Sequence, residues 1–127
     1  MSEYTLEQMK EHRRLWVEAL RSGKYKQGTH ALRSSDDRYC CLGVLCDIAG
    51  VEWGRHSSEL YRAGYDITAA PPKAMGFVGL TDRIGGFGEG SDALASWNDF
   101  GANFAEIADL IESNPPGLFI DSTEEAR

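Results

Sequence analysis

The stretch Tyr39-Cys40-Cys41-Leu42-Gly43-Val44-Leu45-Cys46 is the most apolar run of the chain and decides its fold. Asp37 before the run is typical of a helix start, and Gly50 after it is typical of a helix end. The distance between them suits a helix. We therefore expect a central helix over residues 38–49, with Ser35-Asp36-Asp37 as a turn or N-cap. Periodicity alone does not separate a buried helix from a buried strand in so short a run, so a strand stays the alternative.

All three cysteines, Cys40, Cys41 and Cys46, lie in this run. An odd number of cysteines does not make a disulfide framework. A structural zinc site needs about four ligands, commonly in two close pairs, and the three histidines do not supply them at that spacing. We expect buried free thiols, because unpaired cysteine behaves as a small apolar residue. Metal binding and a reactive thiol are the alternatives; neither a metal nor a cofactor is expected.

Two amphipathic helices flank the central run. Residues 5–8 form a capping box ahead of an expected helix over 6–22. Residues 103–106 form a second such box ahead of a helix over 104–113, which ends at Asn114-Pro115-Pro116 because the residue before a proline avoids the helical region. Together with the central helix, they are expected to share one core built from Trp16, Leu20, Leu42, Leu45, Ile107 and Ile111.

The remaining segments predict smaller elements. We expect short strands within residues 29–34, 61–68 and 92–100, and a short helix over 73–78. The glycine-rich loop 85–90 lacks the Gly-Lys-Ser/Thr ending of a phosphate-binding loop and is typical of a hairpin or lid. The expected fold is α+β: one small compact domain over 1–120, mainly helical with a few short strands. A flexible acidic C-terminal tail is expected over 121–127.

Length and charge bound the function. The chain has 127 residues, 42 % of them hydrophobic, which is ordinary for one globular domain. Its net charge of −7 argues against general nucleic-acid binding, which needs clustered basic residues. Residues 63–127 hold three basic and eleven acidic residues, a net charge of −8. No apolar run reaches the length of a membrane span, and the N-terminus lacks the layout of a secretion signal, so we expect a cytoplasmic protein.

A first candidate binding group follows the N-terminal helix. It combines Lys24-Tyr25-Lys26-Gln27 with Arg33 and Arg38. Lysine and arginine neutralise phosphate, and arginine grips it with a fork of donors. Tyr25 could stack on a base and Gln27 could read its edge. The alternative is a solvated loop whose tyrosine packs partly on the core.

A second candidate group is Trp97-Asn98-Asp99. Tryptophan offers a stacking face to a purine, while the amide and the carboxylate could bind a base or ribose hydroxyls. The alternative is an ordinary turn beside a core tryptophan. Catalytic motifs such as Gly-x-Ser-x-Gly and His-Glu-x-x-His do not occur in the chain, so the evidence for an enzyme is thin.

Three stretches of the chain occur in an order that is characteristic as a set. They are Leu15-Trp16-Val17-Glu18-Ala19-Leu20-Arg21-Ser22-Gly23-Lys24-Tyr25-Lys26-Gln27-Gly28, Tyr39-Cys40-Cys41-Leu42-Gly43-Val44-Leu45-Cys46-Asp47, and Trp97-Asn98-Asp99 followed by Phe104-Ala105-Glu106-Ile107-Ala108-Asp109-Leu110-Ile111. This order resembles a group of small uncharacterised proteins of tailed bacteriophages and prophages. The resemblance spans most of residues 15–119 and implies an accessory protein acting in the cytoplasm of an infected bacterium.

Small phage proteins of this kind often counter host defence, and that analogy shapes the functional hypothesis. The leading hypothesis is a non-catalytic protein that binds and sequesters a small anionic, nucleotide-derived host signal, of the cyclic-nucleotide or ADP-ribose type. We also expect a homo-oligomer, because a second copy could close the site. One alternative is an inhibitor that binds a host protein through the acidic C-terminal half. The other is a phosphodiesterase-like enzyme that degrades such a signal.

Overall fold

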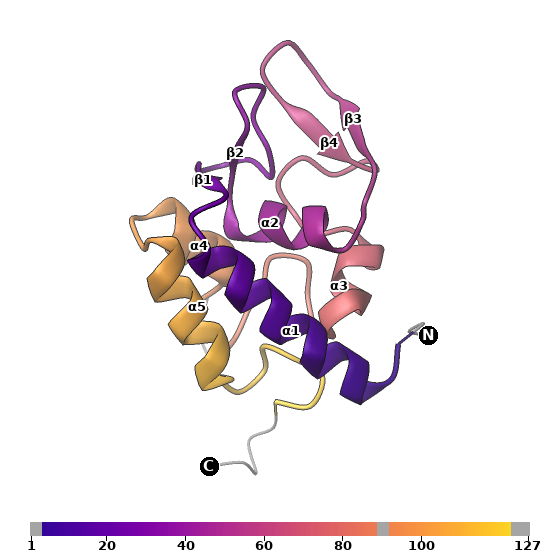
Figure 1. Ribbon diagram of the computed structural model, residues 1–127, viewed down its shortest axis with the longest axis vertical. Coiled ribbons are helices and arrows are strands. Elements are labelled where there is room, and N and C mark those ends of the chain that lie inside the picture. Colours follow the sequence, from indigo (N-terminus) through magenta and orange to yellow (C-terminus); the bar gives the residue numbers. More distant parts are fainter. Residues whose placement is uncertain (1–3, 89–91, 123–127) are drawn as a thin grey trace.

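The computed structural model describes residues 4–88 and 92–122. Within these residues the structure has five helices and four short strands, which confirms the predicted α+β, mainly helical fold (Figure 1). Most of the buried apolar residues form one hydrophobic cluster, and it contains all six core positions expected from the sequence. Trp16 at its centre is fully buried, and its indole Nε1 donates to the carbonyl of Cys41 at 3.0 Å.

Helices α1 (Leu6–Arg21) and α5 (Phe104–Ser113) lie side by side and frame one side of the molecule (Figure 1). Both begin with the predicted capping boxes. The Thr5 hydroxyl accepts from the amide of Gln8, and the Asn103 side chain accepts from the amide of Glu106. Local sequence decides where α1 and α5 begin, because a capping box satisfies backbone donors that have no partner within the helix.

The central helix α2 (Cys41–Ile48) confirms the helical interpretation of the apolar run, but it starts later than expected. The expected start at residue 38 is wrong: Cys40 is the N-cap, and Arg38–Tyr39 form strand β2. The cause is long-range, because the amide of Cys41 is held by the side chain of Asn98 at 3.1 Å. Of the two interpretations of residues 35–37, the turn is confirmed at 35–36 and the N-cap is wrong. A methyl group at Gly43 would overlap the carbonyl of Leu32, so this glycine lets the helix and the preceding loop touch.

The four strands are linked into a narrow ribbon above α2 (Figure 1). Strand β1 (Lys26–Gln27) pairs with β2 in parallel, and β3 (Trp53–Arg55) pairs with β4 (Tyr61–Ala63) in antiparallel fashion. The segment 33–34 joins the two pairs by single bridges, Arg33 to Tyr39 and Ser34 to Leu60. The strand expected within 29–34 is thus reduced to these bridges, and the one expected within 61–68 to its first three residues.

The region after the ribbon carries two short helices. Helix α3 (Pro72–Val78) matches its prediction and ends at Gly79, whose φ of 81° is left-handed. The strand expected within 92–100 is wrong: residues Leu94–Asp99 form helix α4. Leu94 and Asn98, four residues apart, are its buried positions, so this face packs on the core as a helix face does.

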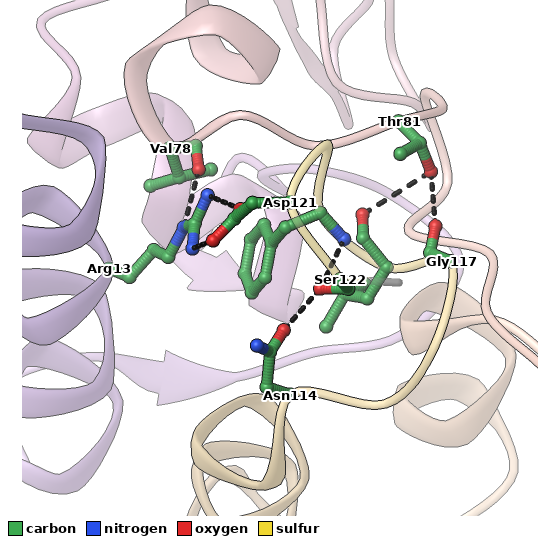
Figure 2. A network of polar contacts seen from close by, with 9 residues as sticks. Arg13, Val78, Thr81, Asn114, Gly117, Asp121 and Ser122 are labelled. Atoms are coloured by element: carbon green, nitrogen blue, oxygen red, sulfur yellow. Dashed lines mark hydrogen bonds and ion pairs between the residues drawn. The ribbon is translucent and has the colours of Figure 1, made fainter. Parts of the chain in front are cut away.

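The C-terminal segment 115–122 closes the core between α1, α3 and α5 (Figure 2). The guanidinium of Arg13 pairs with the carboxylate of Asp121 through two contacts of 2.6 and 3.2 Å. The same guanidinium lies 4.0 Å from the centre of the Phe119 ring, and its Nε donates to the carbonyl of Val78 at 2.7 Å. Arg13 therefore fastens the end of the chain to helix α1.

Ser122 completes this closure. Its hydroxyl donates to the side chain of Asn114 and accepts from the amide of Phe119 at 3.1 Å (Figure 2). Ser122 is buried, so the contacts of the fold extend two residues beyond the predicted domain end at 120. Residues 123–127 of the expected tail lie outside the described residues.

Candidate functional site

The structure brings the two predicted binding groups into direct contact. The side-chain Nε2 of Gln27, on β1, donates to Oδ1 of Asn98, on α4, at 2.9 Å. The same nitrogen donates to the carbonyl of Ala102 at 2.8 Å. Residues 71 positions apart in the chain therefore meet beside the start of α2.

Asn98 is the fixed point of this junction. It is 1 % exposed, and every donor and acceptor of its side chain is used. Its Oδ1 accepts from Gln27 and from the amide of Cys41, while its Nδ2 donates to the carbonyl of Gly28 at 2.9 Å and to Asp99 at 3.2 Å. Asn98 thus positions three segments and has no capacity left for a ligand.

Arg33 is likewise committed to the protein. Its guanidinium lies 4.1 Å from the ring centre of Tyr61 and 5.4 Å from those of Tyr39 and Trp53. It also forms an ion pair with Asp37 at 2.7 Å, and its side chain is only 19 % exposed. Stacking on aromatic faces and a carboxylate partner account for this arginine without a ligand.

Tyr25 belongs to the same aromatic group. Its hydroxyl donates to Asp47 at 2.7 Å, and Asp47 also accepts from the indole of Trp53 at 3.1 Å. Burial and the neighbouring Asp47 carboxylate raise the pKa of the Tyr25 hydroxyl. The ring of Tyr25 packs edge-on against Tyr39, with 5.0 Å between the ring centres. These contacts hold the ribbon on α2.

A shallow pocket remains between β1, the loop 28–37 and β2. Its volume is about 380 Å³, and it is lined by Gln27, Gly28, Thr29, Ala31, Ser34, Asp36 and Arg38. Two of these, Gln27 and Arg38, were expected at a ligand site. The polar residues Thr29, Ser34 and Asp36 were not, because the sequence assigned them to a strand and a turn. The hydroxyls of Thr29 and Ser34 and the carboxylate of Asp36 line the pocket because the loop 28–37 folds back between β1 and β2.

Cations gather at the edge of this pocket. Lys26 and Arg38 are register partners in the parallel strands, and both are exposed. Arg38 pairs with Asp36 at 3.0 Å, while Asp36 also accepts from the Ser34 hydroxyl. The hydrogen bond from Ser34, and after it the one from Arg38, lowers the pKa of the Asp36 carboxyl. Asp36 is therefore ionised at neutral pH. Lys24 is exposed two residues before Lys26.

The other two predicted residues lie on α4. Asp99 accepts from the backbone amide of His30 at 2.8 Å, which ties the beginning of the loop 28–37 to this helix. Trp97 is 40 % exposed and its ring lies 6.3 Å from that of Phe87. Neither residue lines the pocket. Of the nine candidates, Gln27 and Arg38 line the pocket, and Lys26 is the strand partner of Arg38. Lys24 is exposed but is not part of the lining.

The thiols of Cys40, Cys41 and Cys46 are all free and buried, which confirms that expectation. Burial raises the pKa of the Cys40 thiol to about 11, so it stays protonated at neutral pH. Among the described residues, no group of three or more histidine, cysteine, aspartate or glutamate side chains could hold a metal ion. No helix in that part of the chain is long and apolar enough to cross a membrane.

Comparison with known proteins adds a family. The family model described as "Domain of unknown function (DUF8296)" matches residues 8–115. The chain belongs to this family. No curated protein and no solved structure is significantly similar to the chain. The DUF8296 match begins inside α1, covers the ribbon, the pocket and α4, and ends just after α5. All nine candidate residues lie within it, whereas Asp121, the partner of Arg13, lies beyond it.

Proposed function

We propose that this chain is a non-catalytic binding protein that sequesters a small anionic, nucleotide-derived signal. The observation that supports this proposal is the register pairing of Lys26 with Arg38, because Arg38 lines the pocket. Like charges on neighbouring strands repel one another, and a single carboxylate, Asp36, offsets them. A bound phosphate would relieve this repulsion and accept hydrogen bonds from the Arg38 fork.

The rest of the lining suits a sugar. Asp36 offers carboxylate oxygens to a pair of ribose hydroxyls, and Thr29 and Ser34 offer hydroxyls that both donate and accept. On phosphate binding, Arg38 would exchange Asp36 for the ligand, which frees that carboxylate for the ribose. A volume of about 380 Å³ lies at the small end of ligand pockets, and suits one nucleoside phosphate unit at a time.

The pocket is also held in shape before a ligand arrives. Asn98 fixes its floor at Gly28, and the Arg33 stack fixes the ribbon behind it. A binding site that is already ordered loses less conformational freedom on binding, which favours the tight binding that sequestration needs. Binding without turnover requires no nucleophile, and none of the three buried thiols lines the pocket.

Biological context comes from the resemblance to proteins of tailed phages. We propose that the chain acts against a nucleotide-based host defence in the bacterial cytoplasm. We also propose a homo-oligomer, because the pocket is open and a second copy closing over it would increase the buried area of the ligand. Sizing with and without ligand tests this part, and a monomer in both conditions would overturn it.

The ligand hypothesis is tested by thermal unfolding against a panel of cyclic dinucleotides, cyclic oligonucleotides and ADP-ribose derivatives. A ligand at 100 times its dissociation constant adds about 2.7 kcal/mol of stability, which raises the melting temperature by several degrees. The compound should be recovered intact by chromatography after denaturation. A degraded compound would instead identify a phosphodiesterase-like enzyme.

Matched charge reversals locate the site. Arg38→Glu should abolish the shift, whereas Arg83→Glu should preserve it, because Arg83 is exposed away from the pocket and meets Asp66 only at 3.9 Å. No shift with any compound, or equal loss in both variants, would refute the proposal. Each variant should first be shown by circular dichroism to keep the fold.

A further inference from the structure

The end of helix α4 carries the most exposed phenylalanine of the chain. Phe100, at the helix C-cap, is 86 % exposed, and Trp97, one turn earlier, is 40 % exposed. Positions three apart lie on the same side of a helix, so the two rings share one surface. Phe87 extends it, since its ring centre lies 6.3 Å from that of Trp97. We call Phe87, Trp97 and Phe100 the aromatic patch.

The opposite side of α4 explains why these rings face outward. Leu94 and Asn98 point into the core and Asn98 is held by four hydrogen bonds, so the rotation of the helix is fixed. Because the buried side of α4 fixes its orientation, Trp97 and Phe100 lie on the surface. Exposed apolar side chains that are grouped in this way mark an interaction surface more often than isolated ones do.

The segment of chain that carries the patch has charged side chains of one sign. From residue 84 to residue 126 the chain has no lysine, arginine or histidine. Asp92 is exposed just before α4, Asp99 is the last residue of α4, and Glu106 is exposed in the first turn of α5. The backbone links Asp92 directly to the patch, because its carbonyl accepts from the amide of Phe87 at 3.1 Å. Asp82 and Asp92 line one hollow together with Phe87, so carboxylates lie beside the aromatic patch.

We propose that the aromatic patch is a docking surface for a basic segment of another protein, with an apolar side chain as its anchor. The rings would cover the anchor, and the surrounding carboxylates would attract lysine or arginine on either side of it. A second copy that docks patch to patch fits poorly, since it would bring like charges together. An anionic lipid surface or a nucleic acid is disfavoured for the same reason. This proposal is independent of the ligand pocket.

The probe is a library of random 12-residue peptides displayed on yeast, sorted with the labelled full-length protein. The wild type should enrich peptides that combine lysine or arginine with an aromatic or aliphatic residue. Nuclear magnetic resonance should then show the selected peptide shifting the indole signal of Trp97 and not that of Trp16, which is fully buried. Raising the salt from 50 to 500 mM should weaken binding at least fivefold.

Two alanine variants, each of an exposed aromatic residue, serve as test and control for the aromatic patch. Phe100→Ala should weaken binding at least tenfold, whereas Tyr65→Ala should leave it unchanged, because Tyr65 is 100 % exposed in the turn after β4 and lies outside the patch. Both residues are exposed enough for the fold to tolerate the change.

Three results would overturn the proposal: no enrichment over Phe100→Ala, enrichment of acidic peptides, or peptide-induced shifts confined to other regions. Self-association of the wild type that Phe100→Ala abolishes would also overturn it, in favour of a second copy as occupant. Analytical ultracentrifugation up to about 100 µM protein measures this last outcome.

Discussion

Replacement of Asn98 by aspartate tests the junction that holds the pocket in place. The change keeps the shape of the side chain but turns Nδ2, a donor of two hydrogen bonds, into an acceptor that faces the Gly28 carbonyl and the Asp99 carboxylate. At low pH the new carboxyl is protonated and keeps one donor, so one buried hydrogen bond is lost. Such a loss costs about 1–3 kcal/mol.

At neutral pH the cost of Asn98→Asp rises further. Burial at 1 % exposure and the nearby Asp99 carboxylate both disfavour the ionised form, so the folded-state pKa of the new carboxyl lies above its unfolded value of about 3.9. The unfolded state then releases its proton first, and stability falls as the pH rises through that range. A rise of about two pKa units would add roughly 3 kcal/mol, giving about 5 kcal/mol in all at pH 7.

Urea unfolding at pH 4, 5.5 and 7 measures this loss for the wild type and two variants. Asn98→Asp should be mildly destabilised at pH 4 and severely at pH 7. Asn103→Asp is the matched control: Asn103 is exposed and its side chain acts as an acceptor for the amide of Glu106, a task that aspartate performs equally well. A loss below 1 kcal/mol at pH 7, or a loss that does not change with pH, would refute the role assigned to Asn98.

Three further perturbations test other parts of the fold. Asp121→Asn should lower stability by about 1–2 kcal/mol at pH 7, because it removes the charge that pairs with Arg13, a side chain 11 % exposed. The Arg13 guanidinium lowers the pKa of Asp121, so the wild-type advantage, read from urea midpoints, should vanish as the pH falls below about 4. Gly43→Ala should cost more than 3 kcal/mol in the same assay, since the added methyl would overlap the carbonyl of Leu32. The Cys40 thiol, with a pKa raised to about 11, should react with a thiol reagent only at the rate of unfolding, as mass spectrometry would show.

Each of these outcomes has a clear opposite. Equal stability of Asp121→Asn and wild type at pH 7 would mean that the ion pair is worth no more than a surface one. A stable Gly43→Ala variant would mean that α2 and the loop before it do not touch as described. Fast modification of Cys40 in the folded protein would show that the thiol is accessible.

The sequence predicted most reliably what local chemistry decides. The two capping boxes and the end of α3 at Val78 depend on residues within a few positions of each other, and all three are where the sequence predicts them. The core positions on α1 and α5 follow from helical periodicity alone. These features need no knowledge of which distant segments meet.

Helix α4 shows what the sequence could not provide. Its N-cap, Ala93, makes no side-chain hydrogen bond, so no capping signal marks its start. Its six residues are also too few for periodicity to distinguish a helix from a strand. Its type is fixed by the core, which buries Leu94 and Asn98 four positions apart. Asn98 of α4 also holds the amide of Cys41 at the start of α2. The wrong element type at 94–99 and the wrong start of α2 therefore both depend on a contact between segments distant in the sequence.

The candidate site follows the same division. Residue types alone predicted that the segment 24–27 and the segment 97–99 would be polar and functional, and the structure places them in contact through Gln27 and Asn98. Residue types alone could not distinguish a side chain that is free to contact a ligand from one whose hydrogen bonds hold other parts of the protein in place. Asn98 uses both donors of its side chain inside the protein, and Arg33 is stacked on aromatic rings and paired with Asp37. Arg38 instead pairs with Asp36, an exposed carboxylate that a ligand could replace. Under the proposed function, Asn98 and Arg33 hold the surrounding structure in place, and a phosphate would be bound by Arg38 with Lys26 beside it.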